Sequence, residues 1–454
     1  MNPSDTNDVV GEYADATPAD VTRALDAARG AFPAWSHATA QVRADVLGKA
    51  AVELLARREE IGELLAREEG KTRAEAVGEV MRAGQIVQFF AGEAVRLTGE
   101  KFPPVRAGVD IDVSREPVGV VGIITPWNFP IAIAAWKIAP ALAFGNTVVF
   151  KPAELTPATA WAFVDILHRA GVPAGALNLL MGRGPVLGPA IIGGVDALSF
   201  TGSVATGRDI ASRAIARMVK LQLEMGGKNP LVVLNDADLD TAVDCAVKGA
   251  FFQTGQRCTA SSRLIVTDDI HDRFVGAVQA RMTKLNIGHA LEPGTDIGPA
   301  VDQRQLDTDL RYLGIGRREG ARLIGGEVLE RDTPGFYLAP ALFTDTHNRM
   351  QINREEIFGP VASVIRVRDY DEALAVANDT DFGLAAGICT TSLKHARHFQ
   401  AHSQAGLVMI NLPTAGLDYH VAFGGRKASS YGPREQGRYA AEFYTTVKTT
   451  YISS

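Results

Sequence analysis

Short apolar segments alternate with helical segments over most of the chain, and this alternation limits the possible folds more than any other feature. From Val118 onward, stretches with helical spacing separate the apolar segments VGVVGIITP, NTVVFKP, ALNLLMG and DALSFTG. A second series follows, with the apolar segments PLVVLND, RLIVTDD, ASVIRVRD and GLVMINLP. Strands that are connected by helices pair in parallel, with the helices packed on the sheet faces. The sequence therefore predicts an α/β protein with two sheet domains.

The regions outside these two series have different patterns. Residues 19–98 contain long Ala, Leu, Arg and Glu runs with helical periodicity, and Thr17 and Pro18 resemble a helix N-cap. The segment RAGVDIDVSREP (106–117) alternates between apolar and polar side chains, and the tail EFYTTVKTTYISS is rich in β-branched and aromatic residues. We expect helices over residues 19–98, before the first sheet, and a strand in the tail that is added to another element.

Composition excludes several classes of function. A formal net charge of −6 does not provide the basic surface that nucleic acid requires. The longest apolar stretch is interrupted by Lys137 and Pro140, and the first residues lack the features of a signal peptide. Three scattered cysteines, without zinc-ligand spacing, indicate a reducing compartment. We therefore predict a cytoplasmic protein that acts on a small molecule, without nucleic-acid or membrane partners and without a metal.

Cys258 and Glu224 are candidates for a nucleophile and a base. Cys258 lies in the polar segment GQRCTASSR, whereas Cys245 and Cys389 lie in apolar patterns typical of packing residues. A thiolate that holds an acyl group needs a second group to activate the water that releases it, and the Glu224 carboxylate can supply that function. Taken alone, Cys258 could instead be a buried core cysteine and Glu224 an exposed ion-pair partner.

Three further segments follow predicted strands, where α/β sheets bind ligands. Asn128 in TPWNFP can donate to an oxyanion or simply form a turn. Lys151 and Glu154 in FKPAE can contact ribose hydroxyls or form an exposed pair at a strand end. Gly202, Ser203 and Gly207 in SFTGSVATG can present backbone N–H groups to a pyrophosphate, or serve only turn geometry.

A fourth segment, EEIFGPV, precedes a predicted strand. There Glu356 can contact a ribose and Phe358 a flat ring, although an isolated Phe358 would be interpreted as core.

Seven motifs, in order, resemble those of the NAD(P)-dependent aldehyde dehydrogenase superfamily: TPWNFP, FKPAE, FTGS, EMGGKNP, GQRCTASSR, EEIFGPV and FGGRK. The resemblance covers nearly the whole chain. It implies a modified Rossmann cofactor domain (1–98 and 118–225), an α/β catalytic domain (226–439) and a bridging β element (99–117 and 440–454). It also implies that the β element joins subunits into a homodimer or homotetramer.

The resemblance further assigns roles to individual residues. Cys258 would be the nucleophile, Glu224 the general base, and Asn128 with the Cys258 backbone N–H the oxyanion hole. The cofactor would be NAD or NADP, with NAD favoured because the Glu154 carboxylate repels a 2′-phosphate. The residues expected to bind the cofactor are Thr125, Pro126, Trp127, Lys151, Glu154, Gly202, Ser203, Glu356 and Phe358.

The C-terminal region is similar to that of the 2-oxoglutarate semialdehyde (2,5-dioxopentanoate) dehydrogenases. The resemblance thus implies oxidation of this aldehyde through a thiohemiacetal and a thioester on Cys258. Succinate semialdehyde dehydrogenases usually place an arginine where this chain has Trp136. As the cation that pairs with a substrate carboxylate, we therefore predict Arg257, next to the nucleophile.

Two alternatives remain open. One is a dehydrogenase of broad specificity, or one for succinate or glutarate semialdehyde. An apolar funnel of Trp136, Phe129 and Phe423 without a nearby cation would favour broad specificity. The other is a catalytically silent structural protein with the same fold, against which the presence of both Cys258 and Glu224 argues.

Overall fold

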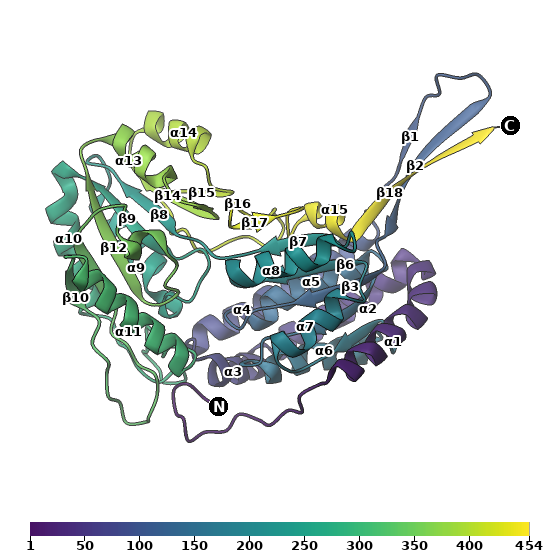
Figure 1. The fold of residues 1–454 in the computed structure, drawn as a ribbon, viewed down its shortest axis with the longest axis horizontal. Helices are drawn as coiled ribbons and strands as arrows, with labels where there is room; N and C mark the ends of the chain where they lie inside the picture. The colour runs from purple at the N-terminus through teal and green to yellow at the C-terminus, as the bar shows by residue number, and fades with distance from the viewer. Residues whose placement is uncertain (454) are drawn as a thin grey trace.

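A computed structural model describes residues 1–453 as two sheet domains and a projecting β arm (Figure 1). The first domain is built on a six-stranded sheet in which five strands are parallel and β17 is antiparallel to β7. In spatial order its strands are β17 (Ser430–Tyr431), β7 (Lys220–Glu224), β6 (Ala197–Thr201), β3 (Val120–Ile124), β4 (Thr147–Lys151) and β5 (Leu177–Leu179).

The second domain contains a seven-stranded sheet that is parallel except for β10 at one edge. Its spatial order is β10 (Arg322–Gly325), β11 (Ala341–Thr346), β12 (Val361–Val367), β9 (Ser261–Thr267), β8 (Asn229–Val233), β14 (Ala385–Cys389) and β15 (Leu407–Ile410). A short pair, β13 (Phe382–Gly383) and β16 (Arg426–Lys427), lies beside this sheet. The predicted α/β fold with two parallel sheets is confirmed.

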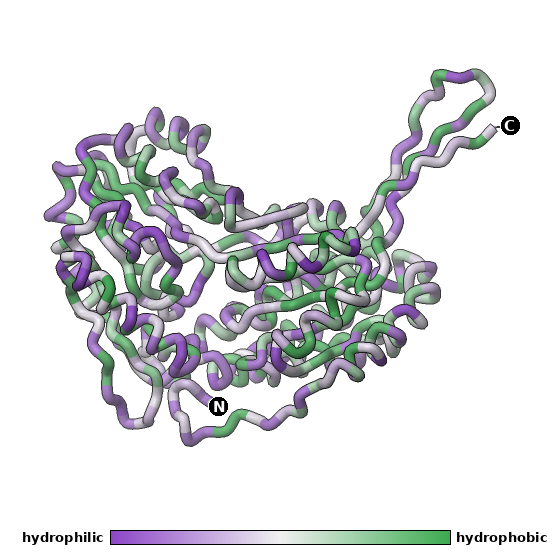
Figure 2. The backbone as a smooth tube through the Cα atoms, viewed as in Figure 1, coloured by the Kyte–Doolittle hydropathy of each residue, from purple (hydrophilic) through white to green (hydrophobic). Residues whose placement is uncertain are grey.

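Helices cover the faces of both sheets, and the apolar segments of the chain lie mainly inside the two domains (Figure 2). The helices of the first domain are α1 (Pro18–His37), α2 (Ala40–Ala56), α3 (Arg58–Glu69), α4 (Arg73–Ala94), α5 (Pro130–Ala143), α6 (Pro157–Ala170), α7 (Gly184–Ile192) and α8 (Val204–Ile215). Those of the second domain are α9 (Leu239–Ala250), α10 (Asp268–Met282), α11 (Gln303–Arg318), α12 (Gln351–Arg354), α13 (Tyr370–Asn378) and α14 (Leu393–His402).

Helix boundaries follow local chemistry. Thr17 and Thr72 each form a capping box, with Asp20 and Glu75 respectively, at the starts of α1 and α4. The predicted cap at Thr17 and the helical character of residues 19–98 are therefore confirmed, with four helices in this region. A fifteenth helix, α15 (Ala441–Tyr444), precedes the last strand. Among the described residues no helix is long and apolar enough to cross a bilayer.

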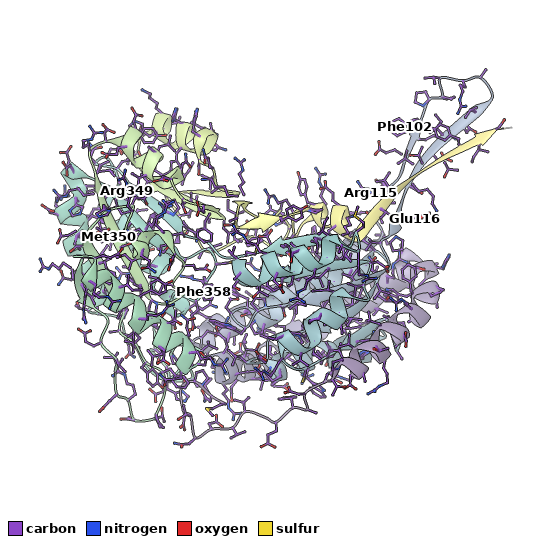
Figure 3. The ribbon with its side chains drawn as sticks, viewed as in Figure 1. Phe102, Arg115, Glu116, Arg349, Met350 and Phe358 are labelled. Atoms are coloured by element: carbon purple, nitrogen blue, oxygen red, sulfur yellow. The ribbon has the colours of Figure 1, made fainter. Side chains whose placement is uncertain are left out.

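The β arm consists of β1 (Glu100–Phe102), β2 (Val109–Pro117) and β18 (Thr445–Ser453), with β2 in the centre. It projects from the first domain and ends at the C-terminus (Figure 1), and Figure 3 labels Phe102 on it and Arg115 and Glu116 near its base. Several large apolar side chains remain exposed on the arm: Val447 (61%), Tyr451 (59%) and Ile452 (51%). The strands expected at 99–117 and in the tail are confirmed.

Two segments make contacts across the expected domain limits. The N-terminal residues bond to the second domain, since Thr6 N donates to Pro334 O (2.7 Å) and Phe336 N to Pro3 O (3.1 Å). The strand β17 comes from the C-terminal part of the chain but extends the first sheet. The limits at residues 98, 118, 226 and 440 stay predictions.

Candidate active site

Cys258 follows a strained turn between α9 and β9. Gln253, Thr254 and Gly255 all have left-handed backbone conformations, with φ of 56°, 56° and 64°. Such conformations cost about 1–3 kcal/mol for a non-glycine residue and persist only where neighbours enforce them. Here Gln253 Nε2 donates to Asn128 O (2.9 Å) and Thr254 Oγ1 to Gly298 O (2.9 Å). The turn therefore holds the cysteine loop in one position.

Asn128 is buried against this loop. Its Nδ2 donates to the carbonyl of Gln256 at 3.0 Å, two residues before Cys258. The backbone carbonyl of Asn128 accepts a hydrogen bond from Lys71 Nζ at 2.6 Å. The amide carries two N–H groups, and within residues 1–453 only the bond to Gln256 uses one of them. A second donor therefore remains for an oxygen close to Cys258.

Glu224 ends β7 and is buried. Ser430 Oγ donates to its Oε2 at 2.5 Å, because β17 pairs with β7 at this position. Burial and the charge of Glu435 raise the pKa of Glu224 well above its usual value, while Ser430 and Lys137 act in the opposite direction. A carboxylate with a raised pKa is a stronger base than an exposed one.

The charges of two carboxylates influence the Cys258 thiol. Burial, followed by the charges of Glu356 and Glu224, raises the pKa of Cys258 to about 12. The Cys258 and Glu356 loops meet at Gly227, whose N–H donates to Glu356 Oε1 (2.8 Å) and where a Cβ would lie 2.8 Å from the Cys258 carbonyl oxygen. A thiol with a pKa this high is protonated at neutral pH.

Glycines allow the Glu356 loop to approach the other two loops. Gly227 N donates to Glu356 Oε1 at 2.8 Å, and a Cβ at Gly226 would lie 2.0 Å from Glu356 Oε2. A Cβ at Gly255 would likewise lie 2.0 Å from the Gly359 carbonyl oxygen. Any side chain at either glycine would separate these loops. Burial raises the pKa of Glu356 to about 7.

A large cleft opens beside these loops, at the carboxyl ends of β3, β4 and β6. Its volume is about 1220 Å³. Seven of the residues predicted to bind the cofactor line it: Thr125, Pro126, Trp127, Lys151, Glu154, Gly202 and Ser203. The Lys151 ammonium is buried and donates to Pro152 O (2.7 Å) and Gly182 O (3.0 Å).

The other two predicted cofactor residues, Glu356 and Phe358, do not line this cleft but a smaller hollow beside the Cys258 loop, together with Gly255 and Arg257. Phe358 has a left-handed φ of 67°, and its ring meets the Trp127 ring edge-on at 5.5 Å between centroids. Figure 3 shows Phe358 at the border of the two sheet domains. Glu356, two residues earlier, is held by Gly227 as described above. Phe358 thus connects the large cleft to the Cys258 loop.

Of the two interpretations that the sequence left open for Gly202 and Gly207, turn geometry fits their backbone N–H groups, because both are bonded within the protein. Gly202 N donates to Glu224 O (3.0 Å) and Gly207 N to Ser203 O (2.9 Å). At the start of α8 the Ser203 side chain caps the helix by accepting from Thr206 N (3.3 Å), and Ala205 and Thr206 of the first turn line the same cleft. Gly202 contributes by bonding β6 to the end of β7, which places Glu224.

Sequence reasoning missed several residues of the cleft. Arg183 and Gly184 lie at the start of α7, and Arg304, Gln305 and Thr308 reach the cleft from α11 in the second domain. A Gly-Pro pair at the start of a helix is a local signal that could have indicated α7. The α11 residues carry no local signal, because only the packing of the two domains brings them to the cleft.

The residues predicted for the substrate fall into two groups. The Trp136 and Phe423 rings pack at 5.3 Å between centroids. Arg257 instead bonds to Lys248 O and, at 3.3 Å, to Gly249 O, which are carbonyls of the last turn of α9. This side chain therefore caps a helix end, and the expectation that it receives a substrate carboxylate is not supported.

Known proteins match this chain over its whole length. Residues 1–450 match the model of the aldehyde dehydrogenase family. An alpha-ketoglutaric semialdehyde dehydrogenase of Bacillus subtilis is 44% identical over 99% of this chain and 93% of the relative. An alpha-ketoglutarate semialdehyde dehydrogenase of Haloferax volcanii is 43% identical over 100% of this chain and 95% of the relative.

Solved structures agree with these matches. A betaine aldehyde dehydrogenase of Staphylococcus aureus in complex with NAD⁺ has a TM-score of 0.97 and 33% identity, covering 100% of this chain and 91% of that one. An NADP-dependent enzyme of E. coli has a TM-score of 0.97 and 36% identity, covering 100% of this chain and 94% of that one. With the family model matched over almost every residue, this chain belongs to the aldehyde dehydrogenase family.

Proposed function

We propose that this enzyme oxidises 2-oxoglutarate semialdehyde to 2-oxoglutarate with NAD(P)⁺. The names of the two relatives above support the substrate. The observation that carries the chemistry is the convergence on the Cys258 loop of an amide donor from Asn128 and the charge of Glu224. A nucleophile, an oxyanion donor and a base within one site are what acyl transfer from an aldehyde requires.

Each group has a defined role in this reaction. The Cys258 sulfur attacks the aldehyde carbon, and the resulting oxyanion accepts hydrogen bonds from Asn128 Nδ2 and the Cys258 N–H. A bound NAD(P)⁺ would supply the hydride acceptor, and its positive charge would favour the Cys258 thiolate. The thioester on Cys258 is then hydrolysed by a water that Glu224 deprotonates. Glu224 therefore makes the reaction a hydrolysis rather than a transfer to another thiol.

We propose that the dinucleotide occupies the 1220 Å³ cleft. Its phosphates would lie at the first turn of α8, and Phe358 and Glu356 would hold the nicotinamide end. Glu154 is exposed at the cleft, where its charge disfavours a 2′-phosphate, so NAD is the favoured cofactor. We also propose that the β arm joins copies of the chain into a cytoplasmic homodimer or homotetramer, since its apolar side chains are exposed.

The test is an assay of NADH and NADPH formation with a panel of aldehydes at equal cofactor concentration. We expect 2-oxoglutarate semialdehyde to have the highest kcat/KM, Cys258→Ala to abolish turnover, and Glu224→Gln to accumulate the thioester after a single burst of NADH. Highest kcat/KM with uncharged aldehydes would instead favour a dehydrogenase of broad specificity, for which the Trp136–Phe423 packing is the supporting observation. Absence of any turnover would favour a structural protein.

A further inference from the structure

One face of α4 lies against the elements that surround the active site. At its first turns, Glu79 Oε1 accepts from the backbone N–H groups of Ile131 and Ala132, both at 3.1 Å, at the start of α5. Farther along, the Phe89 ring meets the Tyr419 ring edge-on at 6.1 Å between centroids. These contacts place the face between the Asn128 turn and the loop that leads to Phe423.

Arg82 lies on this face, one helical turn after Glu79 and two turns before Phe89. Its side chain is half-buried, and burial lowers its pKa while Asp418 and Tyr419 act in the opposite direction. Arginine remains charged in proteins all the same. Within residues 1–453 the Arg82 guanidinium makes no hydrogen bond or ion pair. A half-buried guanidinium without a partner normally contacts an anion.

Other cations around the site already have partners. Lys71 binds Glu79 Oε2 (2.5 Å) and Asn128 O (2.6 Å), and Arg257 caps α9. Lys137 binds Glu435 and Ser199, and Arg434 donates to the Gly425 carbonyl. Arg82 differs from these four because its five donors are unused.

We propose that Arg82 binds the carboxylate of the substrate, and this inference rests on the proposed function. The aldehyde carbon lies at Cys258, beside Asn128, while the carboxylate at the other end of the molecule pairs with the guanidinium on α4. A planar guanidinium can hold a carboxylate through two parallel hydrogen bonds, which also orients the chain of the substrate. The Trp136 and Phe423 rings then contact the carbons between the two ends. Arg82 is thereby a specificity-determining residue, in the role for which Arg257 is unsuitable.

The experiment compares Arg82→Gln, Arg82→Lys and the control Arg73→Gln, which makes the same change on an exposed part of α4. Kinetics are measured with 2-oxoglutarate semialdehyde and with pentanal, an uncharged aldehyde of equal length. We expect Arg82→Gln to lower the ratio of the two kcat/KM values at least tenfold, mainly through KM for the charged substrate. Arg82→Lys should recover part of the loss, and Arg73→Gln should leave the ratio unchanged.

The outcomes separate this inference from the proposed function. If the natural enzyme prefers 2-oxoglutarate semialdehyde but Arg82→Gln keeps that preference, Arg82 does not bind the carboxylate and the proposed function stands. If the natural enzyme has no preference for the charged substrate, the proposed function fails and this inference fails with it.

A second measurement does not depend on turnover. Calorimetric titration with 2-oxoglutarate, the product, should give a Kd at least tenfold higher for Arg82→Gln than for Arg73→Gln. Asp418→Asn removes a competing carboxylate near Arg82 and should tighten 2-oxoglutarate binding. If Arg82→Gln does not fold, the Asp418→Asn variant alone tests the proposal. Unchanged or weaker binding of 2-oxoglutarate by Asp418→Asn would overturn it, because that result would show that Asp418 does not compete for the guanidinium.

Discussion

Replacing Lys71 by methionine should loosen the turn that carries Asn128. Lys71 is 1% exposed, and its ammonium lies 2.5 Å from Glu79 Oε2, 2.6 Å from Asn128 O and 3.8 Å from Glu69 Oε2. It also lies 4.4 Å from the centre of the Phe129 ring. Methionine fills a similar volume but leaves two buried carboxyl groups without a cation. Burial raises the pKa of Glu69 to about 8, and Lys71 is the largest influence that lowers it.

Removing one partner of a buried ion pair costs about 3–5 kcal/mol. Glu79 retains its bonds from Ile131 N and Ala132 N, and the Asn128 carbonyl retains the bond from Gln253. These remaining bonds favour the lower end of the range, about 3 kcal/mol, which corresponds to a roughly hundredfold change in an opening equilibrium. The kcat/KM should fall as well, because Asn128 loses part of what positions it.

Hydrogen exchange of the amides at residues 128–135 measures this local opening directly. We expect exchange about a hundredfold faster in Lys71→Met and unchanged in Lys49→Met, an exposed control on α2. The double variant Lys71→Met/Glu79→Gln has no unpaired charge at residue 79. Its loss of local stability should be smaller, by at least about 1 kcal/mol, than the sum of the losses in the two single variants. Additivity of the two single changes, to within about 0.5 kcal/mol, would refute the assignment of Lys71 and Glu79 as a coupled pair.

Further predictions concern the base, the nucleophile and the arm. Ser430→Ala removes the hydrogen bond that lowers the pKa of Glu224, so the acid limb of the pH profile of kcat should move to higher pH; a move to lower pH would contradict this. Glu356→Gln removes a charge that raises the pKa of Cys258, so more of the thiol is ionised at pH 8 and iodoacetamide should alkylate the cofactor-free enzyme faster. An unchanged alkylation rate would contradict this influence of Glu356 on Cys258. Ile452→Glu places a charge on the arm, so light scattering should show smaller assemblies, and an unchanged mass would show that this face is not an interface.

The alternation of strands and helices was sufficient to predict the two parallel sheets, because the spacing of apolar residues identifies each strand or helix within about ten residues. The candidate site was predictable where a single segment carries both the chemistry and its backbone, as in the Asn128 turn or the Cys258 loop. Lys71 and Ser430 could not be predicted in this way, because they reach Asn128 and Glu224 from distant segments. The direction of the Arg257 side chain, toward the end of α9, could not be predicted either, because adjacency to the nucleophile in sequence does not determine where a side chain points.

The strand β7 is held at both ends by one C-terminal segment. At its first residue, Lys220 Nζ donates to the carbonyls of Glu442 (2.6 Å) and Thr445 (2.8 Å), where the arm begins. At its last residue, Glu224 accepts from Ser430. In the proposed assembly, contacts on the arm therefore act through β7 on the carboxyl group that is proposed to activate water. Dissociation of subunits at high dilution should then alter the rate of thioester hydrolysis before it alters cofactor affinity.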